Sequence, residues 1–162
     1  MDLARAVLAG VAAFLAATPA FAATTTRTLT VSASVSSSCA IAVDPVNFGT
    51  ITVVPTPNID VVGTVRVTCS PGLAWEVAML DGSNASGANR RMRRTDGSAN
   101  YITYRLFRNA GYSQQWRSAP GLTVSGAGTG ALQSLPLYAR ITAGQAPAPG
   151  AYLDVMTAEL RF

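Results

Sequence analysis

The stretch Ile59-Asp60-Val61-Val62-Gly63-Thr64-Val65-Arg66-Val67-Thr68-Cys69 largely alternates apolar and polar residues. This is the period of a β-strand with one face toward a core and one toward solvent. Residues 39–51 alternate in the same way on either side of Asp44-Pro45, and the turn-prone segment 55–58 separates the two stretches. If the stretches are antiparallel neighbours about this loop, their register places Cys39 opposite Cys69. Pattern and cysteines therefore predict the same pair of strands.

The N-terminus has the features of a secretion signal. Arg5 lies in a short polar region, residues 6–17 form an apolar core, and Ala20-Phe21-Ala22 supplies a cleavage site of the small-x-small type. The core is shorter than the roughly 20 residues that a membrane-spanning helix needs, so an uncleaved anchor is the less favoured alternative. We expect a signal peptide over residues 1–22, no membrane span in the mature chain, and one exported domain of about 140 residues.

Cys39 and Cys69 are the only cysteines of the chain. An even number of cysteines in an exported protein predicts a disulfide, which in the chain-entropy model stabilises a loop of this length by about 3–4 kcal/mol. Two cysteines without a histidine are too few ligands for a zinc site. A redox pair is more often spaced Cys-x-x-Cys. We therefore predict a structural disulfide and no metal.

A second alternating segment, residues 28–35, follows the signal and precedes the first cysteine. Its apolar residues share one face: Leu29, Val31, Ala33 and Val35. A strand-forming arm in this position is typical of a segment that completes the sheet of another molecule. The pattern equally permits the first strand of a complete sandwich, paired within its own subunit.

The rest of the chain consists of short alternating runs between turns, with no convincing helix. The predicted inward faces are Leu73, Trp75, Val77 and Met79; Ile102, Tyr104 and Leu106; Leu135, Leu137, Ala139 and Ile141; and Met156, Ala158, Leu160 and Phe162 within a final strand over residues 152–162. Asp96-Gly97 is a predicted hairpin tip, and Pro136 indicates an edge position or a bulge. Some seven strands predict an antiparallel β-sandwich, one strand short unless the arm is included.

Catalysis has little support in the residue types. Histidine is absent, the carboxylates are scattered, and the Gly126–Gly130 run lacks the helix that a phosphate-binding loop needs. We expect no enzyme activity and no cofactor. The net charge of +4 is a weak indication of nucleic-acid binding, and we expect no such partner.

One dense cluster of charge, Arg90, Arg91, Arg93 and Arg94, is a candidate for contact with an anionic surface. A solvated hairpin with Asp96 nearby is the favoured alternative. Three aromatic residues offer a candidate for stacking on carbohydrate, although such residues more often cap a core: Tyr101, Tyr112 and Trp116.

The order and spacing of several short runs resemble the spore coat protein U domain family, which includes the archaic, Csu-type chaperone–usher pilins. The runs are Ser38-Cys39-Ala40-Ile41, Asn47-Phe48-Gly49, Gly63–Cys69, Arg91-Met92, Ile102–Arg108, Trp116, Leu137–Ile141, Ala143-Gly144-Gln145 and Pro149–Asp154. Together they cover almost the whole mature chain, and Met156 and Ala158 stand where the family tends to have valine.

The resemblance implies an incomplete immunoglobulin-like sandwich without its last strand. In such subunits a periplasmic chaperone fills the gap, and an outer-membrane usher then exchanges it for the arm of the next copy. The implied organisation is a signal peptide (1–22), a donor-strand arm (23–37) and a pilin domain (38–162). The implied donor residues are Leu29, Val31, Ala33 and Val35, and the implied acceptor residues are Met156, Ala158, Leu160 and Phe162. Head-to-tail contacts of this kind produce a fibre.

The leading hypothesis is a structural subunit of a surface pilus that serves attachment and biofilm formation, located first in the periplasm and then on the cell surface. The alternatives are a self-contained secreted domain that binds carbohydrate or a surface, and a protein of a cell or spore coat. Whether the subunit forms the shaft or a minor adaptor stays open, as does the identity of any receptor.

Overall fold

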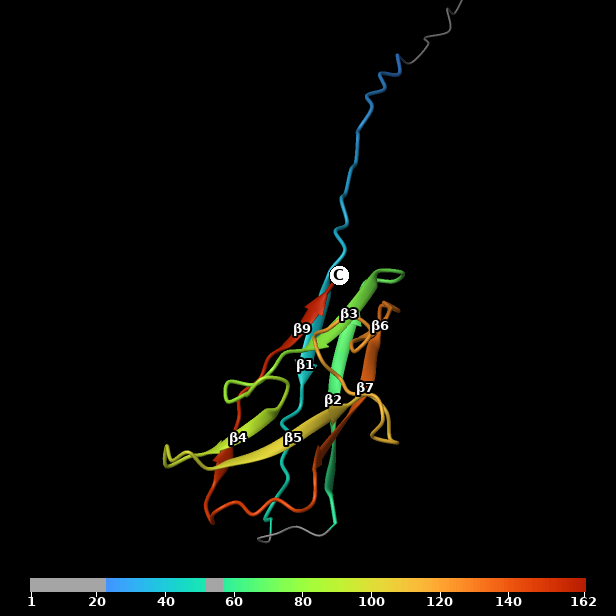
Figure 1. The fold of residues 1–162 in the computed structure, drawn as a ribbon. Coiled ribbons are helices and arrows are strands. Elements are labelled where there is room, and N and C mark those ends of the chain that lie inside the picture. Colours follow the sequence, from blue (N-terminus) through green and yellow to red (C-terminus); the bar gives the residue numbers. More distant parts are fainter. Residues whose placement is uncertain (1–22, 52–56) are drawn as a thin grey trace, which may run out of the picture. The chain divides into compact units, whose positions relative to one another are not determined.

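The computed structural model describes residues 23–51 and 57–162, and within them it contains strands and no helix. The chain divides into two units, Met1–Ser34 and Val35–Phe162. All strands belong to the second unit, the domain (Figure 1). They are β1 (Cys39–Val43), β2 (Ile59–Cys69), β3 (Ala74–Met79), β4 (Arg90–Arg94), β5 (Tyr101–Phe107), β6 (Val124–Ala127), β7 (Leu132–Ile141), β8 (Tyr152–Leu153) and β9 (Ala158–Arg161).

The strands form two antiparallel sheets around one core. The larger sheet has the order β1-β2-β7-β5-β4-β8, and the smaller has the order β6-β3-β9. Every pairing is antiparallel. The predicted fold class, an all-β antiparallel sandwich, is confirmed. The short segment 95–100 joins the neighbouring strands β4 and β5 as a hairpin, a connection that an antiparallel pair allows.

The predicted register of the first two strands is confirmed. Cys39 lies opposite Cys69, and Ile41 lies opposite Val67. The two cysteines form a disulfide with their Cα atoms 4.1 Å apart. The segment 55–58 was predicted to connect these strands, and its first two residues lie outside the described part of the chain.

The core is built from the alternate residues that the sequence indicates. Val65 and Val67 of β2 and Val77 of β3 are completely buried. Trp116, in the connection between β5 and β6, is also completely buried, and its indole Nε1 donates a hydrogen bond to the carbonyl of Val77 at 2.9 Å. Burying such side chains stabilises the fold by about 1.5–3 kcal/mol each. Because Trp116 belongs to the core, it is not available for the predicted carbohydrate stacking.

The final strand differs from its prediction. A single strand over residues 152–162 is wrong, because β8 pairs with β4 in one sheet and β9 pairs with β3 in the other. Between them the carbonyls of Val155 and Thr157 accept hydrogen bonds from the N–H groups of Ser83 and Leu80, both at 2.9 Å. These bonds hold the linking residues against the segment that follows β3, so the chain crosses from one sheet to the other.

Pro136 lies within β7, which is an internal strand, but pairing with β5 covers only residues 138–141. At Pro136 the strand has β2 on one side and no partner strand on the other. A proline is tolerated there because the position is locally an edge.

Candidate functional site

An apolar groove of about 970 Å³ lies between two segments of the domain. One wall is residues 43–51, which begin at the last residue of β1. The other is residues 147–158, which include β8 and end at the first residue of β9. The floor consists of core side chains: Met79, Met92, Ile102, Tyr104, Leu106 and Leu137. The size is that of a binding site for an extended segment or a large ligand. We refer to this feature as the groove.

The first wall is fixed by contacts with β2. The side chain of Val46 packs against Gly63, where a Cβ atom would lie 3.0 Å from Cγ2 of Val46. The Asp44 carboxylate accepts two hydrogen bonds from the guanidinium of Arg66, at 2.5 and 2.7 Å. Phe48 reaches the floor, with its ring centroid 6.4 Å from that of Tyr104. The absence of a side chain at Gly63 thus lets an apolar wall approach the core.

The second wall has backbone groups without partners. The carbonyls of Val155 and Thr157 accept hydrogen bonds from residues 80–83. Asp154, which precedes Val155, and Met156, which lies between Val155 and Thr157, make no backbone hydrogen bond with any described residue. In an extended segment successive backbone groups point to opposite sides, so those of Asp154 and Met156 point away from residues 80–83. Both residues line the groove.

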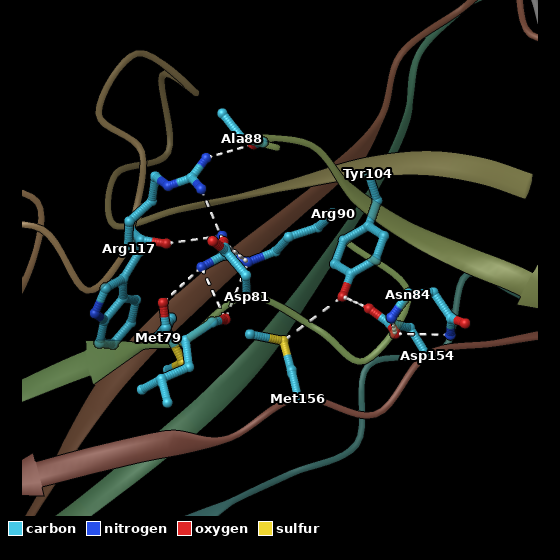
Figure 2. Close-up of polar contacts among 11 residues, drawn as sticks. Met79, Asp81, Asn84, Ala88, Arg90, Tyr104, Arg117, Asp154 and Met156 are labelled. Atoms are coloured by element: carbon cyan, nitrogen blue, oxygen red, sulfur yellow. Dashed lines mark hydrogen bonds and ion pairs between the residues drawn. The ribbon is translucent and has the colours of Figure 1, made fainter. Parts of the chain in front are cut away.

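A polar cluster lies beside this wall (Figure 2). The Tyr104 hydroxyl donates to Oδ2 of Asp154 at 2.7 Å, and the backbone N–H of Asn84 donates to Oδ1 at 3.1 Å. Gly82 is in such close contact with the Asp154 carboxylate that a side chain at this position has no room. Burial raises the pKa of Tyr104, and the hydrogen bond to Asp154 raises it further. The phenol therefore stays protonated and acts as a hydrogen-bond donor. The cluster fixes the direction in which the wall leaves β8.

Arg90 is buried behind the floor, with only 2% of its surface exposed. Its guanidinium donates to the carbonyls of Met79 at 2.6 Å, Leu80 at 3.1 Å and Trp116 at 3.0 Å. Burial lowers the pKa of Arg90, as does the positive charge of Arg117. The prediction of a surface contact is therefore wrong for Arg90. The strand period contained the signal, because Arg90 and the floor residue Met92 share one face of β4.

The sequence of this domain matches a known family. The model of the Spore Coat Protein U domain matches residues 25–159. The chain belongs to the Spore Coat Protein U domain family. The family predicted from the short sequence runs is thereby confirmed. A comparison with curated proteins gives no match.

Solved structures share the fold of this Spore Coat Protein U domain. One is the CsuC–CsuE chaperone–tip adhesion subunit pre-assembly complex from archaic chaperone–usher Csu pili of Acinetobacter baumannii. The match has 24% identity and a TM-score of 0.58, and it covers 78% of this chain and 40% of that chain. The chain thus spans well under half the length of the chain it matches, and the likeness concerns the fold.

Two further structures come from Escherichia coli. The Hda pilus minor tip subunit HdaB matches with 17% identity and a TM-score of 0.44, covering 76% of this chain and 80% of that one. A structure on fibronectin binding and biofilm formation by AAF fimbriae matches with 11% identity and a TM-score of 0.41, covering 76% and 98%. Both TM-scores are below 0.5, too low to bear on the fold or function of this chain.

The predicted acceptor residues of the Spore Coat Protein U domain lie at different places. Met156 and Ala158 line the groove. Leu160 packs against the core without lining it. Phe162 is 64% exposed. The sequence did not predict that residues 43–51 form a wall of the groove. The apolar residues of this segment alternate only briefly, between Asp44-Pro45 and the proline-rich segment that follows, so the pattern does not identify a binding surface.

The predicted donor residues lie in a segment without regular structure, since residues 23–38 form neither helix nor strand. The side chains of Leu29, Val31 and Val35 are exposed, at 87%, 84% and 97%, and Ala33 is exposed as well. An alternating apolar segment that forms no strand in a single copy has its apolar face open to a partner.

The remaining arginines of the predicted cluster are held in place individually. Arg91 stacks over the ring of Tyr101, 4.1 Å from its centroid. Arg93 donates to the carbonyls of Gly97 and Ser98. Arg94 forms an ion pair with Asp96 at 2.9 Å. A contact of these three residues with an anionic surface stays a prediction.

Within residues 23–51 and 57–162, no group of three or more histidine, cysteine or acidic side chains is placed to hold a metal ion. The same residues contain no helix that is long and apolar enough to cross a membrane.

Proposed function

We propose that this chain is a structural subunit of a surface pilus, assembled head to tail by donor-strand exchange and serving attachment and biofilm formation. The observation that carries the proposal is the groove: an apolar floor beside a wall whose backbone groups at Asp154 and Met156 have no partner among the described residues. An exposed strand edge beside apolar surface is unfavourable and prone to aggregation. A strand that pairs with this edge satisfies the free backbone groups and covers the apolar surface.

The occupant that we propose is the arm of a neighbouring copy, residues 28–35. Eight residues in extended form span about 26 Å, at roughly 3.3 Å per residue. The wall that they would face contains residues 147–158. Leu29, Val31 and Val35 contribute about 1.5–3 kcal/mol each on full burial, and Ala33 contributes least. The acceptor residues are Met156 and Ala158 in the groove, with Leu160 and Phe162 continuing beyond it.

The partners that we propose follow from the exposed apolar surface of the groove. An open groove exposes apolar surface after export, so a periplasmic chaperone covers it until an outer-membrane usher brings the next arm. The family and the likeness to a chaperone–subunit complex of Csu pili support these partners. Residues 1–22 then act as the signal peptide, 23–37 as the arm and 38–162 as the pilin domain. The chain is located first in the periplasm and then on the cell surface. It has no enzymatic role.

A chain lacking residues 24–37 tests this proposal. We expect the full chain, produced without a chaperone, to form oligomers, and the shortened chain to be monomeric and poorly stable. A synthetic peptide of residues 27–36 should raise the thermal midpoint of the shortened chain. The control peptide carries Leu29→Asp and Val31→Asp and should have no effect.

A full chain that is a stable monomer, together with a shortened chain that ignores the peptide, would contradict the proposal. That result would favour a self-contained secreted binding domain instead.

A further inference from the structure

Tyr104 of β5 connects the two walls of the groove across its floor. Its ring centroid lies 6.4 Å from that of Phe48, which belongs to the first wall. Its hydroxyl donates a hydrogen bond to Oδ2 of Asp154 at 2.7 Å and lies 3.8 Å from the sulfur of Met156, and both of these residues belong to the second wall (Figure 2). The Tyr104 side chain therefore reaches from one wall to the other.

Tyr104 differs from the rest of the groove floor in size and in freedom to move. Its two neighbours on the inward face of β5 are Ile102 and Leu106, whose aliphatic side chains are shorter than a phenol. Met79 and Met92 also belong to the floor, and a methionine side chain adapts its conformation easily to a neighbour. The Tyr104 side chain is buried, and its contacts with both walls hold the ring in place. A strand that enters the groove therefore has least room for its side chains above Tyr104.

The proposed donor arm carries a small side chain within its apolar face. Leu29, Val31 and Val35 are large, whereas Ala33 has a single methyl group. Alternate residues of a strand lie about 6.6 Å apart, twice the rise per residue, so each of the four side chains meets a different part of the floor. Packing in a protein interior is close, and extra methylene groups in a filled site are destabilising. The small residue of the arm and the fixed ring of the floor are therefore complementary in shape.

We propose that Ala33 of an incoming arm lies over Tyr104 and that this fit sets the register of the arm in the groove. The inference rests on the proposed donor-strand function and adds to it the pair of residues that determines specificity. Val31 and Val35 then lie on either side of the ring, over the shorter and more adaptable parts of the floor. A shift of the arm by two residues places a valine on the ring, and a shift by one residue turns the polar face inward. An arm with a large residue at this place is excluded in the same way.

The test uses the full chain, produced with its leader and purified after export, and compares three variants that place leucine in the arm. Ala33→Leu puts it over Tyr104, Val31→Leu puts it at another inward position, and Ser32→Leu puts it on the outward face. All three positions are exposed in a single copy, so the changes leave the domain fold intact. The measurement is the share of chains in oligomers, determined by sedimentation velocity at the midpoint concentration of the wild type. We expect this share to fall at least about tenfold for Ala33→Leu and to stay within about twofold of the wild type for the two control variants.

A second change in the same chain tests where Ala33 lies. In a head-to-tail assembly every copy supplies both an arm and a groove, so one chain can carry a change in each. Phe48→Ala removes the ring that packs on Tyr104 and makes room there. We expect the double variant, Ala33→Leu with Phe48→Ala, to regain oligomers to within about threefold of the wild type, because the two changes compensate each other in volume. Fluorescence of the buried Trp75 and Trp116 shows whether the domain with Phe48→Ala is folded.

The inference is wrong if Ala33→Leu assembles as well as Val31→Leu, or if a folded double variant assembles no better than Ala33→Leu alone. Either result leaves the proposed function intact, because the wild-type chain still forms oligomers. If the domain with Phe48→Ala does not fold, the comparison of the three arm variants decides. A wild-type chain that stays monomeric contradicts the proposed function itself, and this inference with it.

Discussion

Two alternating stretches of this domain, β2 and residues 152–161, have a similar sequence pattern and different surroundings. β2 has β1 on one side and β7 on the other, and Val65 and Val67 are completely buried. Residues 152–161 break into two strands that each have a single neighbour, and Met156, Ala158 and Leu160 are half-buried. Alternation therefore specifies a strand and its inward face, whereas the number of neighbours is set by the rest of the fold.

The largest expected effect concerns Arg90, which is buried behind the floor of the groove. Arg90→Met removes the donors to three carbonyls, those of Met79, Leu80 and Trp116, and leaves them buried without partners. We expect the free energy of unfolding to fall by about 4 kcal/mol, measured by urea denaturation. Arg94→Gln, on the same strand and partly exposed, is the control and should change it by less than about 0.5 kcal/mol. Equal effects of the two changes would show that Arg90 has no special role.

The disulfide comes next, because it joins β1 to the well-paired β2. Replacing Cys39 and Cys69 by serine should lower the free energy of unfolding by about 3–4 kcal/mol, since the unfolded chain regains the entropy of the closed loop. Equilibrium denaturation of the oxidised protein and of the double variant measures this difference. A loss below about 1 kcal/mol would mean that the pairing of β1 does not need the covalent bond.

A direct contrast between the regions uses two alanine variants. Ile141→Ala, in the completely buried core, should cost about 2–5 kcal/mol of stability and leave the affinity for the 27–36 peptide unchanged. Met156→Ala, in the groove wall, should cost less stability in the isolated domain because the side chain is already partly exposed, but it should weaken peptide binding. Urea denaturation measures the stability of both variants, and peptide titration measures their affinity. If Ile141→Ala weakened peptide binding and Met156→Ala did not, the distinction between core and groove would be wrong.

The smallest expected effect is a pH dependence of stability, which comes from the ion pairs that β2 forms with its neighbours. The Arg66 guanidinium lowers the pKa of Asp44, and that of Arg140 lowers the pKa of Asp60, both from an ordinary value of 3.8. A depressed pKa in the folded state contributes stability that is present above about pH 3.8 and is lost as the pH falls through the folded value. Thermal midpoints measured between pH 5 and 2 should fall less steeply for Asp60→Asn than for the wild type. An identical slope would show that the ion pair is too exposed to matter.

The sequence was sufficient for the alternating strands β1, β2, β3, β5 and β7, their inward faces and the first register, because these depend on local alternation and on two cysteines. It was not sufficient for the break after β8, which depends on hydrogen bonds from Leu80 and Ser83, far away along the chain. Nor was it sufficient for Arg90, since an arginine is buried only where the fold brings carbonyls to its guanidinium.

The groove also has one part that the sequence predicts and one part that it does not. The predicted acceptor residues Met156 and Ala158 line the groove because the strand period alone places them inward. The opposite wall needs the approach of Val46 to Gly63, which lie far apart along the chain. Contacts of this kind are formed by tertiary structure and leave no periodic signal in the sequence.

Hydrogen exchange at the amides of Asp154 and Met156 tests the central claim most directly. In the chain lacking residues 24–37 these amides should exchange freely while those of β2 are protected. Addition of the 27–36 peptide should slow their exchange at least about tenfold and leave β2 unchanged. Strong protection of Asp154 and Met156 before the peptide is added, or no change when it is saturating, would contradict the claim that this wall of the domain awaits a strand from another copy.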